Sequence, residues 1–336
     1  MKLSAPGKVI LFGEYAVLSG YDAVVIAVDR YAHLHRKSET GDFKVVAENV
    51  GHYHPANEIY DLPFAEAIHQ IQPDLQGCWL TETHEFSIES KKLGLGSSAA
   101  ATVTMAAAAL GFSVEDRSAV YRLAQHAHRQ VQGLGSGADI AASVFGGALR
   151  YSWTERPNDL GASDNQALHT PFGSARIEHL PETQIPIHLV WSGHSARTTD
   201  LVNAVHRFAA QDTHTFQRCI EDINGATRMA IEGWSDEDRL PICAAIRAGH
   251  AAIEKLGSAT GVPLITPAHH KIAQLVAEDG AMKSTGAGGG DLVWFMGKSP
   301  EKDRYIKKKL EAAGFPVFEC RMAPGVSCIP TPLDKE

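Results

Sequence analysis

Residues 91–110 read KKLGLGSSAAATVTMAAAAL, a loop of small residues that leads directly into an alanine-rich segment. Alanine has the highest helix propensity, so this segment predicts a helix over 99–110, which Gly111 is placed to end. The glycines before it let the backbone approach an anion, and the first turn of the helix offers unpaired N–H groups and the positive end of a dipole. The hydroxyls of Ser97 and Ser98 are suited to phosphate oxygens or a metal ion. The loop therefore predicts phosphate binding, with an ordinary capped turn as the alternative.

The same loop also matches the GxGxxA pattern of dinucleotide-binding folds, through Gly94, Gly96 and Ala99. That interpretation needs a buried strand before the loop and an acidic residue closing a second strand about 20 residues later. The preceding segment instead ends in the polar residues 89–92, and Asp116 falls at the start of a predicted helix. A GxxxxGK[ST] motif is absent from the sequence. Both a dehydrogenase and a P-loop kinase are therefore disfavoured.

Composition is that of a globular soluble protein, with 44% hydrophobic and 21% charged residues, and 336 residues suffice for two ordinary domains. The net charge of -8 argues against nucleic-acid binding but not against small anionic substrates, which a few placed cations can hold. We see no signal peptide, and 99–110 is too short to span a bilayer. We expect a cytoplasmic protein, monomer or homodimer, that binds a small molecule and neither nucleic acid nor a membrane.

The cysteines and histidines do not show the spacing of a metal site formed by protein side chains. The five cysteines form no CxxC pair and are odd in number, which is typical of reduced thiols. The 17 histidines include no HExxH motif, so we interpret His126, His128, His269 and His270 as structural or solvent-facing.

Strand and helix patterns alternate along the chain, which indicates an α/β or α+β protein. Apolar runs predict strands over 2–8, 9–12, 22–28, 43–47, 86–88, 185–191 and 292–296, with a turn at Pro6-Gly7 between the first two. Helical spacing predicts helices over 63–71, 99–110, 114–132, 138–144, 198–210, 240–256, 267–278 and 301–313. Prolines and weak periodicity over 151–183 place a domain boundary there, giving domains 1–183 and 184–336.

Three further motifs stand out, each with an ordinary structural alternative. Lys8 follows Pro6-Gly7 and precedes an apolar run, where it is either held rigidly or a solvated surface lysine. Asp139 lies between glycines and an apolar helix, so it either caps that helix or faces a cleft and acts on a substrate hydroxyl. The stretch KSTGAGGGD at 283–291 suggests a backbone that closes over a ligand, or a tight turn.

Taken together with the loop at 94–100, these motifs resemble those of the GHMP kinase superfamily, in this order and over most of the chain. The first motif resembles 5–8 with 13–14, the second 94–100, and the third 283–291. The resemblance implies a two-domain α+β fold with an S5-domain-2-like N-terminal domain and a ferredoxin-like C-terminal domain. It also implies an ATP-dependent phosphotransferase with ATP and Mg²⁺ in the cleft between the domains.

The resemblance also implies roles for individual residues. Asp139 would orient and deprotonate the attacking oxygen, and Lys8 would pair with Asp139 and polarise the acceptor. Related decarboxylases lack the lysine, so Lys8 favours a kinase. Ser98 would help to bind Mg²⁺, without a carboxylate partner that we can name. The ATP phosphates would be held by Lys92, Gly94, Leu95, Gly96, Ser97, Ser98 and Ala99. The acceptor would lie near Tyr15, Ser136, Gly137, Ser195, Arg197, Gly286, Ala287 and Gly288.

Local sequence further favours the branch of the superfamily whose acceptor already carries a phosphate. Tyr15 follows Gly13-Glu14, and the segments 127–141 and 191–199 are similar to that branch. Another branch has a Mg²⁺-binding glutamate eleven residues before the aspartate, where this chain has His128. A phosphorylated acceptor brings about two negative charges, so further cations are expected near it. The candidate contacts are Lys91, Lys92, His194, Ser195 and Arg197, with a solvated pair beside the loop as the alternative for Lys91 and Lys92. Another alcohol kinase of this superfamily, or a non-catalytic sensor, remains the alternative, and the sensor is disfavoured by Lys8 and Asp139.

Overall fold

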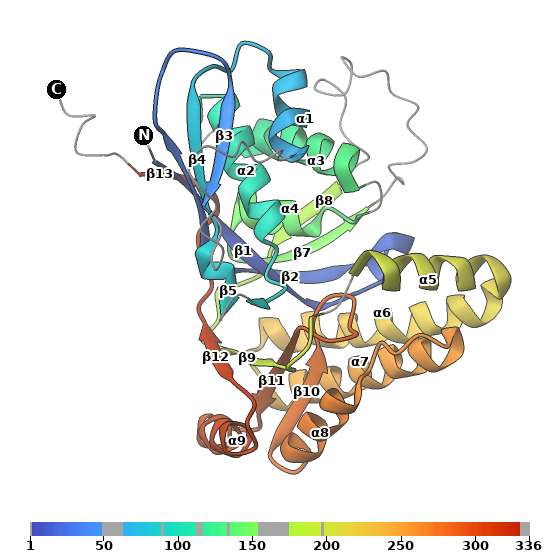
Figure 1. Cartoon of the computed structure of the whole chain (residues 1–336). Helices are drawn as coiled ribbons and strands as arrows, with labels where there is room; N and C mark the ends of the chain where they lie inside the picture. The colour runs from blue at the N-terminus through green and yellow to red at the C-terminus, as the bar shows by residue number, and fades with distance from the viewer. Residues whose placement is uncertain are drawn as a thin grey trace.

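The fold is seen in a computed structural model that describes residues 2–48, 63–88, 91–111, 117–132, 135–153, 175–195 and 198–329. Helices and strands are arranged around two main sheets, one above the other in Figure 1. The predicted α+β class is confirmed. Among the described residues, none of the helices combines the length and the apolar character needed to traverse a bilayer.

Seven of the described strands form the first sheet, in the order β13-β1-β2-β4-β3, with β7 paired to β2 and β8 to β7. Neighbours are antiparallel except β3 and β4, which are parallel. The strands are β1 (Lys2–Phe12), β2 (Ala23–Arg36), β3 (Lys44–Glu48), β4 (Cys78–Glu82), β7 (Ala148–Trp153), β8 (Ala175–His179) and β13 (Ser327–Ile329). A short hairpin of β5 (Ser87–Ile88) and β6 (Lys91–Lys92) follows the 3-10 helix η2 (His84–Phe86).

The predicted turn at Pro6-Gly7 is wrong, because β1 runs through it as one strand. Its pairing with β2 instead shifts in register between Pro6 and Gly7, an irregularity of the kind that bends a strand without ending it. A Cβ at Gly7 would lie 2.7 Å from the carbonyl oxygen of Leu95, so only glycine allows the 94–96 loop this close. The N–H of Lys8 donates to the same Leu95 oxygen at 2.8 Å. The bulge thus joins two of the sequence motifs directly.

Four helices pack with the first sheet: α1 (Pro63–Ile71), α2 (Ser97–Ala109), α3 (Arg117–Gln132) and α4 (Ala138–Phe145). α2 and α4 lie on β1 and β2, α3 packs on α2, and α1 packs on α3. α2 is buried on almost every side, and Ala99, Ala100, Val103 and Ala106 are fully buried. Its small side chains therefore let it lie between the sheet and a second helix layer, which fixes the position of its N-terminus.

The second sheet has the antiparallel order β10-β11-β9-β12. Its strands are β9 (Ile187–Trp191), β10 (Gly280–Ser284), β11 (Leu292–Gly297) and β12 (Val317–Cys320). The helices around it are α5 (Thr198–Gln211), α6 (Thr213–Ser235), α7 (Arg239–Thr260), α8 (Pro267–Val276) and α9 (Pro300–Ala312). α7, α8 and α9 contact β10 and β11, while α6 packs on α7 and on the 3-10 helix η1 (Ala16–Ser19).

The chain crosses between the two sheets more than once. The boundary predicted at residues 183 and 184 falls between β8 of the first sheet and β9 of the second. After β12 the chain returns, and β13 pairs with β1 through Leu3 and Cys328. The division into two domains stays a prediction, and the returning strand shows that the C-terminal residues complete the N-terminal sheet.

Candidate active site

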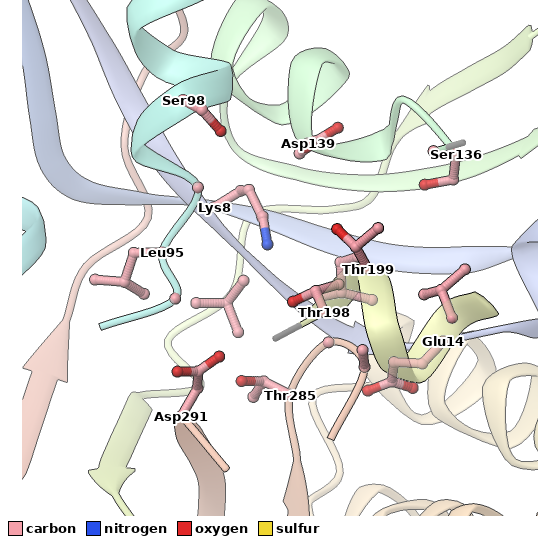
Figure 2. A pocket seen from close by; sticks show the side chains of 18 of the residues that line it. Lys8, Glu14, Leu95, Ser98, Ser136, Asp139, Thr198, Thr199, Thr285 and Asp291 are labelled. Atoms are coloured by element: carbon pink, nitrogen blue, oxygen red, sulfur yellow. The ribbon is translucent and has the colours of Figure 1, made fainter. Parts of the chain in front are cut away.

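A cavity of about 370 Å³ lies where the sequence motifs meet (Figure 2). Its walls come from β1, the loop before α2, the starts of α4 and α5, and the loop after β10. The predicted residues that line it are Lys8, Tyr15, Lys92, Gly94, Leu95, Gly96, Ser97, Ser98, Ser136, Asp139, Gly286 and Ala287. Segments distant in sequence therefore form one concave site of the size that small ligands occupy.

The N-terminus of α2 forms one wall and is suited to an anion. Its N-cap is Gly96, in the left-handed region with φ +80°, and no side chain caps the helix. The first internal bond runs from the N–H of Ala100 to the Gly96 oxygen at 3.1 Å. The N–H groups of the first turn are therefore left to a ligand or solvent, at the positive end of the helix dipole.

Lys8 reaches into the cavity past this helix terminus, as Figure 2 shows. A Cβ on Gly96 would lie 2.9 Å from the Lys8 Cε and 3.0 Å from its Cγ, so the lysine stem packs directly on the glycine. Across the cavity, a Cβ on Gly94 would lie 3.0 Å from the Asp291 carboxylate. The two glycines thus leave room for a cation and an acid on either side of the loop.

Asp139 lies in the first turn of α4 and does not cap it, because the N-cap is Gly137 with φ +78°. Its Oδ1 accepts the N–H of Ile140 at 3.0 Å, and its Oδ2 lies 3.9 Å from Nε2 of His128. The side chain is 24% exposed and lines the cavity, as the cleft interpretation predicts. The ion pair with Lys8 that the resemblance implies is not formed between these two described residues, although both line the same cavity.

A buried hydrogen-bond network holds the loop before α4. The carbonyl oxygen of Ser136 accepts from Tyr151 Oη at 2.6 Å and from Trp153 Nε1 at 2.5 Å. A Cβ at Gly137 would lie 1.6 Å from Nε2 of Gln125, so a larger residue would displace the Gln125 amide, and the φ of +78° also favours glycine there. Gly137 was predicted to contact the acceptor but is not among the lining residues. It acts on the site by letting α4 start where Asp139 faces the cavity.

Several other predicted residues take structural positions. Ala99 is fully buried in α2 and does not line the cavity. Gly288 does not line it either, and a Cβ at this position would lie 2.5 Å from the Leu264 carbonyl oxygen, so the glycine allows the loop to pack on Leu264. Ser195 Oγ donates to the Lys92 carbonyl oxygen at 3.3 Å, outside the cavity lining. Arg197 lies outside the described residues.

Tyr15 lines the cavity but is largely buried, with φ +62°. Its Oη donates to the carbonyl oxygen of Ala287 at 2.6 Å. Burial, and then the charge of Glu14, raises the pKa of the Tyr15 phenol well above its ordinary value, so the hydroxyl stays protonated. Tyr15 therefore ties the segment after β1 to the loop after β10, both of which line the cavity.

A buried ion pair between Glu14 and Lys283 makes the same connection deeper in the protein. Lys283 Nζ also donates to the Ser284 oxygen at 2.7 Å and lies 5.5 Å from the centre of the Phe12 ring. Burial raises the pKa of the Glu14 carboxyl and lowers that of the Lys283 ammonium, while each partner's charge opposes that shift. Sequence reasoning missed this pair, because only the fold brings together residues 269 positions apart.

Reasoning from sequence also assigned no role to Thr198, Thr199 and Asn203, which line the cavity from the first turns of α5. The available signal was weak: the two threonines open a predicted helix and close the segment 191–199, which resembles the superfamily but was given no role for them. In Figure 2 these threonines lie across the cavity from Lys8 and Ser98.

The lining residues fit a magnesium ion that arrives with a nucleotide better than a protein-only metal centre. No group of three His, Cys, Asp or Glu side chains gathers to hold a metal anywhere in the described ranges. Mg²⁺ usually takes one or two protein oxygens together with substrate phosphates and waters. The Ser98 hydroxyl and the Asp139 carboxylate line the same cavity as the anion-binding helix terminus and supply such oxygens.

Known proteins share sequence and fold with this chain. Residues 64–147 match the family described as GHMP kinases N terminal domain. The chain therefore carries a GHMP kinase N-terminal domain over these residues, as its motifs predicted, and it is a phosphotransferase. The predicted GHMP kinase fold is confirmed.

More particularly, the chain is similar to two phosphomevalonate kinases. That of Streptomyces sp. (strain CL190) is 27% identical, over 92% of this chain and 94% of the relative. That of Saccharolobus solfataricus is 29% identical, over 90% and 92%. The mevalonate kinase of Pyrococcus abyssi is 25% identical, over 93% and 92%.

Two solved structures share the fold. A Lin0012 protein from Listeria innocua superposes with a TM-score of 0.84 at 26% identity, covering 97% of this chain and 99% of the other. The phosphomevalonate kinase of Streptococcus pneumoniae, in complex with phosphomevalonate and AMPPNP, has a TM-score of 0.80 at 16% identity, covering 96% and 100%.

Proposed function

We propose that this protein transfers the γ-phosphoryl group of ATP to 5-phosphomevalonate, giving ADP and 5-diphosphomevalonate in the mevalonate pathway of isoprenoid biosynthesis. The observation that carries the proposal is one cavity lined by the uncapped start of α2, by Lys8 and by Asp139. The similarity to two phosphomevalonate kinases supports this acceptor. The cytoplasmic location and the oligomeric state, monomer or homodimer, stay predictions.

In this proposal the start of α2 holds the ATP phosphates, with Lys8 and Lys92 as the nearby cations. Ser98 contributes a hydroxyl to Mg²⁺, which when bound neutralises charge on the phosphate oxygens. Asp139 orients the attacking oxygen and takes its proton where it carries one. The bond between the γ-phosphorus and the bridging oxygen breaks, and its electron pair leaves with ADP as the new bond to the acceptor oxygen forms.

A mevalonate kinase is the second candidate, because mevalonate kinases are also similar to the chain over most of its length. Its acceptor presents a neutral hydroxyl, whose proton must move during transfer. A non-catalytic sensor on the same fold is disfavoured, since Lys8 and Asp139 both line the cavity.

The test is an ADP-release assay with phosphomevalonate and mevalonate side by side at equal concentrations. We expect turnover with phosphomevalonate and a kcat/KM for mevalonate lower by about 100-fold or more, since a site built for a polar group rejects analogues that lack it. Faster turnover with mevalonate would support the second candidate. ATP binding without ADP release in the presence of either acceptor would support a sensor.

A further inference from the structure

His128 has a buried ring nitrogen at the wall of the cavity that makes no hydrogen bond among the described residues. It lies on α3, is 5% exposed and lines the cavity beside Asp139. Its Nε2 is buried and makes no hydrogen bond within the described structure. The ring stacks on Phe64 of α1, with centroids 5.2 Å apart and planes within 15°. This stacking contact restrains the orientation of the ring, and with it the position of the nitrogen that makes no hydrogen bond.

The nearest charged atom is Oδ2 of Asp139, 3.9 Å from the His128 nitrogen. That distance exceeds a hydrogen bond but is short for electrostatics, and a carboxylate favours a hydrogen on the nitrogen that faces it. A buried donor without an acceptor is rare in folded proteins. An oxygen atom of a ligand next to Asp139 would satisfy it.

The neighbouring groups favour an anionic oxygen. An acceptor phosphate has a second pKa near 6 and so brings close to two negative charges at pH 7. Beside the Asp139 carboxylate these charges repel, unless a donor or cation lies within contact. Arg129, the next residue on α3, has its guanidinium over the Trp153 ring at 5.5 Å. His128 is the side chain that faces Asp139 directly.

We propose that His128 is a specificity-determining residue that donates from Nε2 to an oxygen of the phosphate already present on the acceptor. The inference rests on the proposed function and deepens it. His128 keeps its hydrogen throughout: the acceptor's phosphate oxygen forms the new bond to the γ-phosphorus, and the electron pair of the broken bond leaves with ADP. A neutral hydroxyl acceptor places no such charge next to Asp139 and gains less from His128.

The first experiment measures kcat and KM separately for His128→Gln and His128→Glu. His128→Gln should lower kcat/KM for phosphomevalonate by about 10–100-fold, mainly through KM, the range of a hydrogen bond to a charged group. The KM for ATP and the melting temperature should stay near wild type. His128→Glu places a second negative charge beside Asp139. With phosphomevalonate, its kcat/KM should fall further than that of His128→Gln. With mevalonate, the two variants should lose the same amount of kcat/KM.

His126→Gln is the matched control, because His126 lies on the same helix and does not line the cavity. It should leave the acceptor KM within about twofold. An unchanged acceptor KM in His128→Gln overturns the proposal. An equal rise in the KM for ATP and the KM for the acceptor in His128→Gln also overturns it. So does an equal rise of the acceptor KM in His126→Gln, because a structural role for the helix would produce either result.

A second readout does not depend on turnover. In ¹⁵N-histidine-labelled protein, addition of phosphomevalonate alone should shift the His128 Nε2 resonance, and the same signal should be missing from His128→Gln. No shift at saturating acceptor overturns the proposal. If the wild-type protein fails to turn over phosphomevalonate, the proposed function fails at that step, whereas the titration still shows whether His128 contacts a phosphate.

Discussion

At the scale of single residues, Gly96 determines how Lys8 enters the cavity. Its φ of +80° lets α2 begin with its first N–H groups uncapped, and its missing side chain leaves room for the lysine stem. An alanine there would adopt the left-handed conformation at a cost of about 1–2 kcal/mol. It would also displace Lys8, because the new Cβ would lie 2.9 Å from the lysine Cε.

Gly96→Ala should therefore lower stability by about 1–2 kcal/mol and raise the KM for ATP by about tenfold. Gly261→Ala is the matched control, since Gly261 has φ +68° and nothing within 4 Å of its Cβ position. Urea unfolding should show similar losses in both variants, while only Gly96→Ala changes the KM. If Gly96→Ala keeps the wild-type KM for ATP, Lys8 does not contribute to binding the ATP phosphates as proposed.

Asp139→Ala should reduce turnover by about 100-fold or more, because the attacking oxygen loses the group that orients it. Nucleotide affinity, measured by titration in the absence of acceptor, should stay within a few-fold, since in the proposed function the start of α2 and the nearby lysines hold the ATP phosphates. Turnover like that of the wild type would remove Asp139 from its proposed role.

At the scale of elements, α8 begins with a capping box that uses a histidine in the acceptor position. The N–H of His269 donates to Thr266 Oγ1 at 3.3 Å, and the N–H of Thr266 donates to His269 Nδ1 at 3.2 Å. The side chain is fully buried, and burial lowers the pKa of His269 to about 4. The neutral imidazole is therefore part of the folded helix terminus.

Stability should fall as the pH drops from about 6.5 to about 4. In this window the unfolded histidine binds a proton that the folded one rejects, so protonation favours unfolding by up to about 3 kcal/mol. His269→Asn keeps an acceptor for the cap and removes the titration. The difference in unfolding free energy between wild type and variant, measured in urea from pH 7 to 4, should shrink or reverse as pH falls. A constant difference would contradict the prediction.

Elements with strong local patterns were predictable from sequence, and those defined by distant partners were not. The helix over 63–71 coincides with α1, and that over 198–210 with α5 to within one residue. α6 (Thr213–Ser235) was not predicted, since its apolar residues are interrupted by polar ones and by Gly225 and Gly233. β10 (Gly280–Ser284) was not predicted as a strand. Its last two residues fall in the stretch 283–291, for which a ligand-closing backbone or a tight turn was predicted, and Lys283 is buried in the fold, where it pairs with Glu14.

In the candidate site, too, some residues were predictable from local motifs and others depend on how distant elements pack. Lys8, Ser98 and Asp139 were predicted from motifs, and the structure brings them to one cavity. The contact between His128 and Asp139, and the bonds from Tyr151 and Trp153 to the Ser136 oxygen, depend on how α3 and β7 pack. Packing of that kind leaves no pattern at fixed spacing in the sequence.

At the scale of the whole molecule, the buried pair of Glu14 and Lys283 connects the end of β1 with β10. Removing one partner from such a pair leaves an uncompensated buried charge, whereas replacing both by apolar residues is often tolerated. We therefore expect Lys283→Met alone to lose about 3–5 kcal/mol of unfolding free energy. The double variant Glu14→Leu, Lys283→Met should be more stable than either single variant.

A double-mutant cycle by urea unfolding measures this coupling. Losses that simply add would contradict it, and would show that the two side chains stabilise the fold independently.

The pairing of β13 with β1 also bears on how the molecule is made. Leu3 leaves the ribosome well before its strand partner Cys328, which follows more than 300 positions later. At ordinary rates of synthesis the first strand waits on the order of tens of seconds with one edge unpaired. The nascent chain is then open to wrong strand pairing, and we infer that the first sheet is completed only once the residues of β13 have been synthesised.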